Sequence, residues 1–227
     1  MPIIPVGTVV ATLAVAFVVA SIYIVVRMAR EAGRAAQRQE RNRALIEERA
    51  TANGRSFRRG HGEEIWRQEG KTKTGLAWTL SYEIALKDRW DTTDGPTTRV
   101  PDGIAGQSLQ WRCAELKRQG EPFRFCSREV EAKAAEIRID PEHPLWGRWR
   151  LEVNDEALAR RAFSPAVCES LAMLPKEAAS NTQQDRRTAI VLSGLGMSGV
   201  LGVYEPKADL VERWIEICES IAVQAQT

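Results

Sequence analysis

The chain opens with a long apolar run. Residues 2–26 contain no charged side chain, and Arg27 ends the run. A helix of this length extends roughly 35 Å, at about 1.5 Å per residue, and crosses a hydrocarbon core of about 30 Å. A cleaved signal peptide would carry basic residues ahead of a shorter apolar core, and a buried core helix is rarely this long. The pattern predicts a transmembrane helix over residues 1–27.

An arginine-rich segment follows the apolar run and begins with Arg27, Arg30 and Arg34. Basic residues beside a span stay on the cytoplasmic side. We therefore expect a single-pass protein of a bacterial inner membrane, with its N-terminus outside and the rest of the chain in the cytoplasm. These three arginines are candidates for contact with the headgroups of the lipid bilayer. The alternative is that they serve only as a topology signal on a solvated helix.

Good helix formers continue beyond the span. The segment is rich in Arg, Ala, Glu and Gln and lacks proline, which predicts a basic helical stalk over residues 28–54. Asn53 and Gly54 fit a helix C-cap, because glycine accepts the positive φ that such a cap needs.

The remaining residues, 55–227, show short alternating apolar segments that indicate strands. These segments are 65–66, 76–86, 123–126, 137–139, 149–153, 188–192 and 197–204. Residues 109–116 fit either a strand or a helix. The pattern predicts one α+β domain of mostly antiparallel strands covered by helices.

Helical spacing and capping residues indicate where those helices lie. Residues 129–135 are helical in composition, Asn154 is placed to cap a helix over 155–162, and Ser164 with Pro165 begins another helix. After Pro206, the C-terminal helix is amphipathic and directs one apolar stripe toward the sheet. The stripe residues are Leu210, Trp214, Ile217, Cys218 and Ile221.

Charge and cysteine content narrow the function classes. The chain has 32 Lys+Arg and 30 Asp+Glu, and residues 27–50 hold seven of the arginines but only four of the acids. The domain is therefore near neutral, which argues against a nucleic-acid partner. The four cysteines have no C-x-x-C spacing and are expected to be reduced core residues in a cytoplasmic domain.

No residue pattern predicts a catalytic, cofactor or metal site. Residues 194–199 fit G-x-G-x-x-G, but a poor helix former follows them, so a glycine-rich hairpin is expected instead of a nucleotide site. His61 and His143 have no partner at a metal-ligand or triad spacing and are expected at the surface. Most of the seven tryptophans are expected in the core. Trp90 and Trp146 lie in turn-like contexts and are candidates for an exposed surface that binds a partner protein.

The order of these features carries a loose resemblance. The chain order is a span, a basic stalk, the segment GEEIWRQEGKTKTGLAWTLSYE, the loop TTRVPDGI, the segment RWRLEVNDEALARRAFSP, and a final hairpin and helix. In this order the chain resembles uncharacterised, single-pass, membrane-anchored bacterial proteins of unknown function. The resemblance supports the architecture and implies no activity.

The function that these features favour is a membrane-tethered, non-enzymatic interaction or scaffold domain with a protein partner. Two alternatives remain open. One is a membrane-bound hydrolase or ligand-binding enzyme that uses loop carboxylates. The other is an envelope component whose domain lies outside the cytoplasm.

Overall fold

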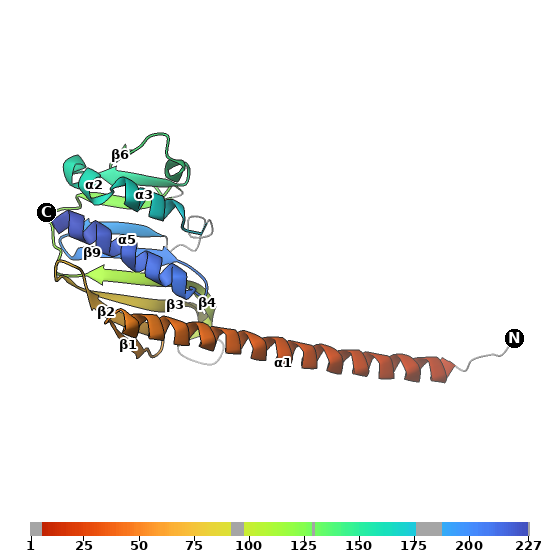
Figure 1. Ribbon diagram of the computed structural model, residues 1–227. Helices are drawn as coiled ribbons and strands as arrows, with labels where there is room; N and C mark the ends of the chain where they lie inside the picture. Colours follow the sequence, from red (N-terminus) through yellow and green to blue (C-terminus); the bar gives the residue numbers. More distant parts are fainter. Residues whose placement is uncertain (1–5, 92–97, 129, 176–187, 227) are drawn as a thin grey trace. The chain divides into compact units, whose positions relative to one another are not determined.

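The computed structural model describes residues 6–91, 98–128, 130–175 and 188–226 (Figure 1). The side chains of residues 6–16, 18–19, 86–91 and 98–105 lie outside this description. Two compact units make up the chain, Met1–Leu45 and Ile46–Thr227.

Helix α1 extends without interruption from Val6 to Ala52. The structure confirms the predicted C-cap: Gly54 has a φ of +69°, and the N–H groups of Gly54 and Arg55 donate to the carbonyls of Thr51 and Ala50 at 3.0 and 2.9 Å. These two bonds form a Schellman motif, which satisfies carbonyls that the helix end leaves without partners.

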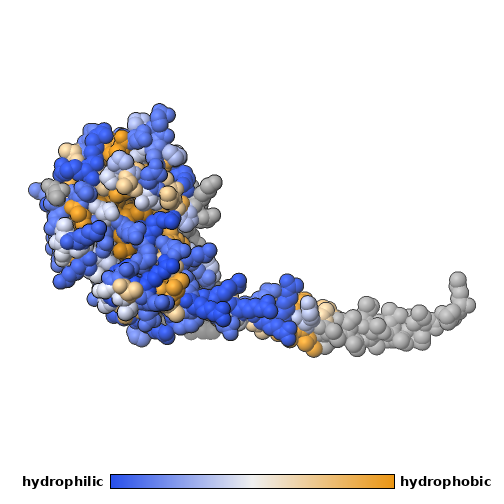
Figure 2. All heavy atoms as spheres, viewed as in Figure 1, coloured by the Kyte–Doolittle hydropathy of each residue, from blue (hydrophilic) through white to orange (hydrophobic). Residues whose placement is uncertain are grey.

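The predicted span lies mostly outside the described side chains, and its residues 1–5 lie outside the described backbone. Among the residues that are described, no helix combines the length and the apolar composition that crossing a membrane requires. Hydrophilic residues follow the first exposed apolar side chains of α1 in Figure 2, in agreement with the arginine-rich composition of the segment.

The described strands form one antiparallel sheet of nine strands in the order β1-β2-β3-β4-β9-β8-β5-β7-β6. Their bounds are β1 (Ser56–Arg59), β2 (Glu64–Lys71), β3 (Ala77–Asp91), β4 (Thr98–Cys113), β5 (Phe123–Ser127), β6 (Ala135–Ile137), β7 (Trp149–Val153), β8 (Ala189–Ser193) and β9 (Gly196–Gly202). The α+β prediction is confirmed, and the undecided segment 109–116 contributes the end of β4.

Helices cover one face of this sheet (Figure 1). They are the short 3-10 helix η1 (Pro144–Gly147), α2 (Glu156–Ala162), α3 (Pro165–Ala172) and α5 (Ala208–Gln226). Helix α5 packs on β4 and β9 and also contacts α2 and α3. The Ser164 cap with Pro165 is confirmed, whereas α2 is capped by Asp155, whose side chain accepts from the N–H of Leu158. Asn154 instead donates to the carbonyl of Glu121.

The core lies between the sheet and α5. Strand register places Trp111 opposite Gly199, and Trp214 of α5 packs on that glycine. A Cβ at position 199 would stand 2.7 Å from the Cys218 sulfur and 3.1 Å from the Trp214 ring. The apolar stripe of the C-terminal helix is therefore core, as predicted. Six of the tryptophans are buried: Trp66, Trp78, Trp111, Trp146, Trp149 and Trp214.

The predicted helix over residues 129–135 is wrong. The described residues of that segment are irregular and lead into β6 at Ala135. The guanidinium of Arg150 on β7 donates to the carbonyls of Arg128 and Val130. These carbonyls therefore accept hydrogen bonds from a side chain distant in the sequence, 22 residues away for Arg128, and not from the N–H groups of a helix. Here a tertiary contact overrides the local helix propensity.

Candidate functional site

A groove of about 1080 Å³ lies beside α5 in the folded unit. We call it the α5 groove. Four parts of the chain build it: the segment that follows α1, the facing ends of β2 and β3, the end of β4 with the residues after it, and α5. Its lining comprises Asn53–Ser56, Glu69–Lys71, Ala77–Thr79, Arg112, Ala114, Glu115, Glu212, Ile215, Glu216 and Glu219.

Three carboxylates of α5 form one wall of this groove. Glu212, Glu216 and Glu219 are spaced by four and three residues, so that the helical period places them on the same face. A row of like charges on one face is unfavourable unless other groups compensate it, and the structure shows two such compensations.

The first compensation is an ion pair between Glu212 and Arg55. Both guanidinium nitrogens Nη1 and Nη2 of Arg55 contact the carboxylate, and Asn53 Nδ2 donates to the same group at 3.1 Å. The Arg55 and Glu212 side chains are only 10% and 18% exposed. Arg55 also donates to Gln68 Oε1 at 3.1 Å. Glu212 is therefore neutralised by a fixed partner from the segment that follows α1.

The second compensation is a hydrogen bond from Trp78 to Glu219. The indole Nε1 donates to Glu219 Oε1 at 2.6 Å. Burial raises the pKa of Glu219; the bond from Trp78 and the charges of Arg55 and Lys73 oppose that shift, and Glu212 adds to it. Gly70 makes this position of Trp78 possible, because a Cβ there would stand 2.5 Å from the indole ring.

The groove lining combines carboxylates with basic side chains. Its lining contains no histidine and no cysteine. Glu115 accepts the N–H of Ala77 at 2.9 Å, and Lys71 and Arg112 are exposed. Glu216 is exposed as well. Among the described residues, no group of three or more His, Cys, Asp or Glu side chains is arranged to hold a metal ion.

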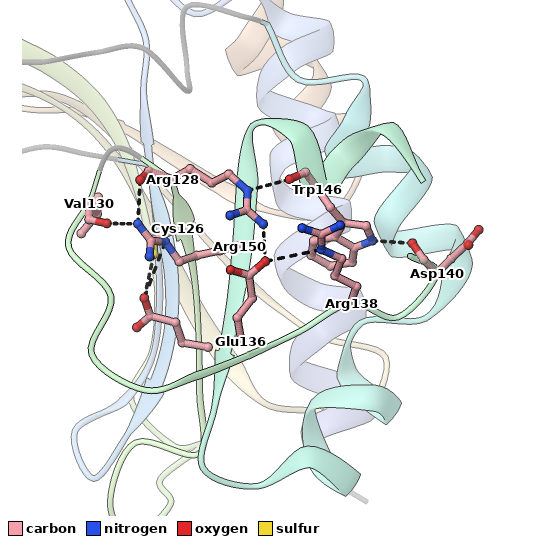
Figure 3. Close-up of polar contacts among 9 residues, drawn as sticks. Cys126, Arg128, Val130, Glu136, Arg138, Asp140, Trp146 and Arg150 are labelled. Atoms are coloured by element: carbon pink, nitrogen blue, oxygen red, sulfur yellow. Dashed lines mark hydrogen bonds and ion pairs between the residues drawn. The ribbon is translucent and has the colours of Figure 1, made fainter. Parts of the chain in front are cut away.

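A second polar cluster lies on β5 and β7 (Figure 3). Arg150 Nη2 donates to the carbonyl of Arg128 at 2.6 Å and to that of Val130, while Arg150 Nε lies 3.7 Å from Glu152 Oε1. Cys126 Sγ lies 3.9 Å from the same carboxylate oxygen. Glu152 is 2% exposed and Cys126 is fully buried. These groups bond one another and attach the segment after β5 to the sheet, so the cluster is structural.

Trp146 belongs to this second cluster, and its predicted exposure is wrong. The side chain is 2% exposed, and its indole Nε1 donates to the carbonyl of Asp140 at 2.7 Å. Arg128 Nε donates in turn to the Trp146 carbonyl. The glycine and proline that suggested a turn belong to η1, which folds the indole inward.

The structure places the other predicted site residues as follows. Trp90 lies in β3 opposite Arg99 of β4, and its side chain is outside the described residues. Arg27, Arg30 and Arg34 are exposed on α1, where Arg27 pairs with Glu31 at 2.9 Å.

The glycine-rich motif is the β8–β9 hairpin, as predicted. Gly196 has a φ of +113°, and a Cβ there would stand 2.4 Å from the Cys113 carbonyl oxygen. His143 differs from expectation, because its side chain is 12% exposed. Its Nδ1 accepts the N–H of Leu145 at 3.2 Å and caps η1.

Sequence reasoning missed the α5 groove. Its central contacts, Arg55 with Glu212 and Trp78 with Glu219, join residues 157 and 141 positions apart. One signal was available: Glu212 and Glu219 recur at seven residues on the polar side of a helix whose other side is core. That spacing shows that the two glutamates share one face of the helix, but it does not show which residues they contact.

No protein-family model and no curated protein sequence matches the chain. Among solved structures, the chain is similar to the one in the crystal structure of the mycobacterial trehalose monomycolate transport factor A, TtfA. The match has 9% sequence identity and a TM-score of 0.42, and it covers 80% of this chain and 92% of that chain. A likeness of this size supports no conclusion about function.

Proposed function

We propose that the protein is a membrane-tethered, non-enzymatic interaction domain. In this proposal the opening part of α1 spans the inner membrane with the N-terminus outside. The folded unit lies in the cytoplasm and binds a basic segment of a partner protein in the α5 groove.

The tether is supported by the length and composition of α1. Helix α1 is continuous from Val6 to Ala52, and residues 6–26 carry no charge. Those residues rise roughly 30 Å along a helix, which matches the hydrocarbon thickness of a bilayer. Arg27, Arg30 and Arg34 follow this segment directly. Basic residues next to a span favour the cytoplasmic side of the membrane, so they support a cytoplasmic location for the rest of the chain.

The observation that carries the binding role is the incomplete compensation of the acidic wall. Glu212 is held by Arg55, but Glu219 has a raised pKa despite its bond to Trp78, and Glu216 faces solvent beside it. A lysine or arginine side chain entering the groove supplies the missing positive charge, and Ile215 and Ala77 supply apolar contact. Charge-assisted bonds to carboxylates are the stronger class of hydrogen bond in proteins.

The tether is tested by membrane fractionation of the full-length protein. We expect the protein to remain in the pellet after an alkaline carbonate wash, and a reporter fused after Thr227 to be active only in the cytoplasm. Release by the wash would overturn the span. A reporter active only outside would favour the alternative of an envelope component.

The binding role is tested by isolating the full-length protein from native membranes in mild detergent. Glu216→Lys reverses a charge in the groove, and Glu142→Lys reverses an exposed charge far from it in sequence and outside the lining. We expect the amount of partner recovered to fall about tenfold with Glu216→Lys and to stay unchanged with Glu142→Lys. Equal recovery with both variants would exclude the groove as the binding site.

A further inference from the structure

A stripe of arginines follows one face of α1 beyond the proposed span. Arg27, Arg30, Arg34, Arg38 and Arg41 recur at intervals of three, four, four and three residues, and all five are exposed. Because an α-helix turns once in 3.6 residues, these intervals keep the five side chains on one face. The stripe extends roughly 21 Å at about 1.5 Å per residue.

Most of the stripe has no counter-charge within the described part of the protein. Arg27 pairs with Glu31 at 2.9 Å, whereas the other four arginines have no acidic group within ion-pair distance among the described residues. Glu40 pairs instead with Arg43, away from the stripe. Like charges three and four residues apart repel one another and weaken a helix. An anionic partner along this face removes that repulsion.

Lipid headgroups account for only the first part of the stripe. This step rests on the proposed tether, which places Arg27 at the membrane boundary. The headgroup layer adds about 5–8 Å on each side of a bilayer, and screening limits charge attraction to about 8 Å. Arg38 and Arg41 lie roughly 16 and 21 Å beyond Arg27 along the helix. A helix lying flat on the membrane needs an apolar face, and only Met28 and Leu45 are large and apolar in residues 27–45.

The acidic wall of a second copy is also a poor match. Of its three carboxylates, Glu212 is already paired with Arg55 and Glu219 accepts the bond from Trp78, which leaves only Glu216 exposed to face five arginines. An acidic segment from another protein has no such competition.

We propose that the arginine stripe binds an acidic helix of a partner membrane protein on the cytoplasmic side. A helix with Glu or Asp at intervals of three and four residues presents its carboxylates at the same rise as the arginines. Arginine suits this pairing, because its planar guanidinium binds a carboxylate through two parallel hydrogen bonds.

The test uses the full-length protein in nanodiscs of zwitterionic lipid and two synthetic helical peptides. Each peptide has an Ala and Gln background and one glutamate for each arginine of the stripe. One peptide places its glutamates on one face at the intervals of the stripe, and its isomer distributes them around the helix. We expect the one-face peptide to bind about tenfold more tightly. Equal binding of both peptides overturns the proposal.

A variant with unchanged composition provides the matched control. Arg34→Ala with Ala36→Arg, and Arg38→Gln with Gln39→Arg, move two charges off the stripe and keep the net charge. We expect this variant to retain its helix content by circular dichroism and to lose the preference between peptides; a retained preference contradicts the stripe.

Tighter binding of single-stranded polyuridylate than of the one-face peptide would assign the stripe to nucleic acid. Failure to enter nanodiscs would refute the tether, and the peptide comparison in solution would still test the stripe.

Discussion

The indole nitrogen of Trp78 and the carboxylate of Glu219 meet at 2.6 Å across 141 residues of sequence. This bond joins β3 to α5 at one wall of the α5 groove. Glu219 lies in a partly buried position, and one bond from a neutral donor does not replace the water that a charged carboxylate loses. Burial therefore raises the pKa of Glu219, and the bond from Trp78 opposes that shift while it fixes the position of the carboxylate.

Replacing Glu219 with Gln should change the pH dependence of stability. The raised pKa means that the folded state binds this proton more tightly than the unfolded state does. The stability contributed by the proton is present below the ordinary carboxyl value of 4.5 and is lost as the pH rises through the raised pKa. Glu219→Gln keeps an acceptor for Trp78 without a charge. Urea unfolding should show the variant gaining stability over the wild type as the pH rises above 4.5 through the raised pKa.

Glu216→Gln is the control for this experiment, because Glu216 is exposed on the same helix face. Its stability difference from the wild type should stay nearly constant over the same pH range. A difference for Glu219→Gln that is flat, or that favours the wild type at high pH, would contradict the assignment.

The Arg55–Glu212 pair should behave as a coupled unit. Arg55→Met and Glu212→Gln each remove one partner from a pair whose side chains are 10% and 18% exposed. Each single change should cost about 2–4 kcal/mol, because it leaves a charge or donor without its partner in a poorly hydrated site. The double variant should cost less than the sum of the two, with a coupling of about 1–3 kcal/mol in a double-mutant cycle by urea unfolding. Additive effects would mean that the pair contributes little.

The sequence predicted those features of the fold that local chemistry determines. The Gly54 cap follows from the need for a positive φ, and the core stripe of α5 follows from helical periodicity. Alternation identified most strands. The order of the strands was not predicted, because β4 pairs with β9 and β5 with β8 across long connections that no local pattern encodes.

The candidate site is formed almost entirely by contacts between residues far apart in the sequence, so the sequence did not predict it. Trp146 shows why a local interpretation failed: glycine and proline neighbours suggested a turn at the surface, but the indole bonds the Asp140 carbonyl and is buried. Glu219 was visible only as a polar residue on an amphipathic helix. Its hydrogen-bond partner Trp78 comes from a distant strand, and the Trp78 ring has room there because Gly70 has no side chain.

Two glycines of the folded unit, Gly199 in β9 and Gly147 in η1, should tolerate substitution unequally. Gly199→Ala introduces a Cβ 2.7 Å from the Cys218 sulfur and should cost about 1–3 kcal/mol through overpacking beneath α5. Gly147→Ala is the matched control, because nothing lies within 4 Å of its Cβ position. Thermal unfolding of both variants checks the prediction. Equal melting temperatures would show that α5 does not pack closely on β9.

The four cysteines should be chemically inert until the domain unfolds. Cys113, Cys126, Cys168 and Cys218 are free and buried. Burial raises the pKa of Cys126 and of Cys168 to about 11, and it also raises the pKa of Cys218 well above the ordinary thiol value. Because the thiolate is the reactive form, only about one thiol in a thousand is ionised at pH 8 for a pKa near 11, and each sulfur is also shielded.

A disulfide exchange reagent such as DTNB measures this inertness directly. The native protein at pH 8 should release almost no chromophore over minutes, and four equivalents should appear after denaturation in guanidinium. Leu195→Cys supplies an exposed reference, because Leu195 is 88% exposed at the β8–β9 turn. That variant should react with one equivalent in the native state. A wild-type thiol that reacts as fast as this reference would place that cysteine at the surface and would contradict the packing of its strand or helix.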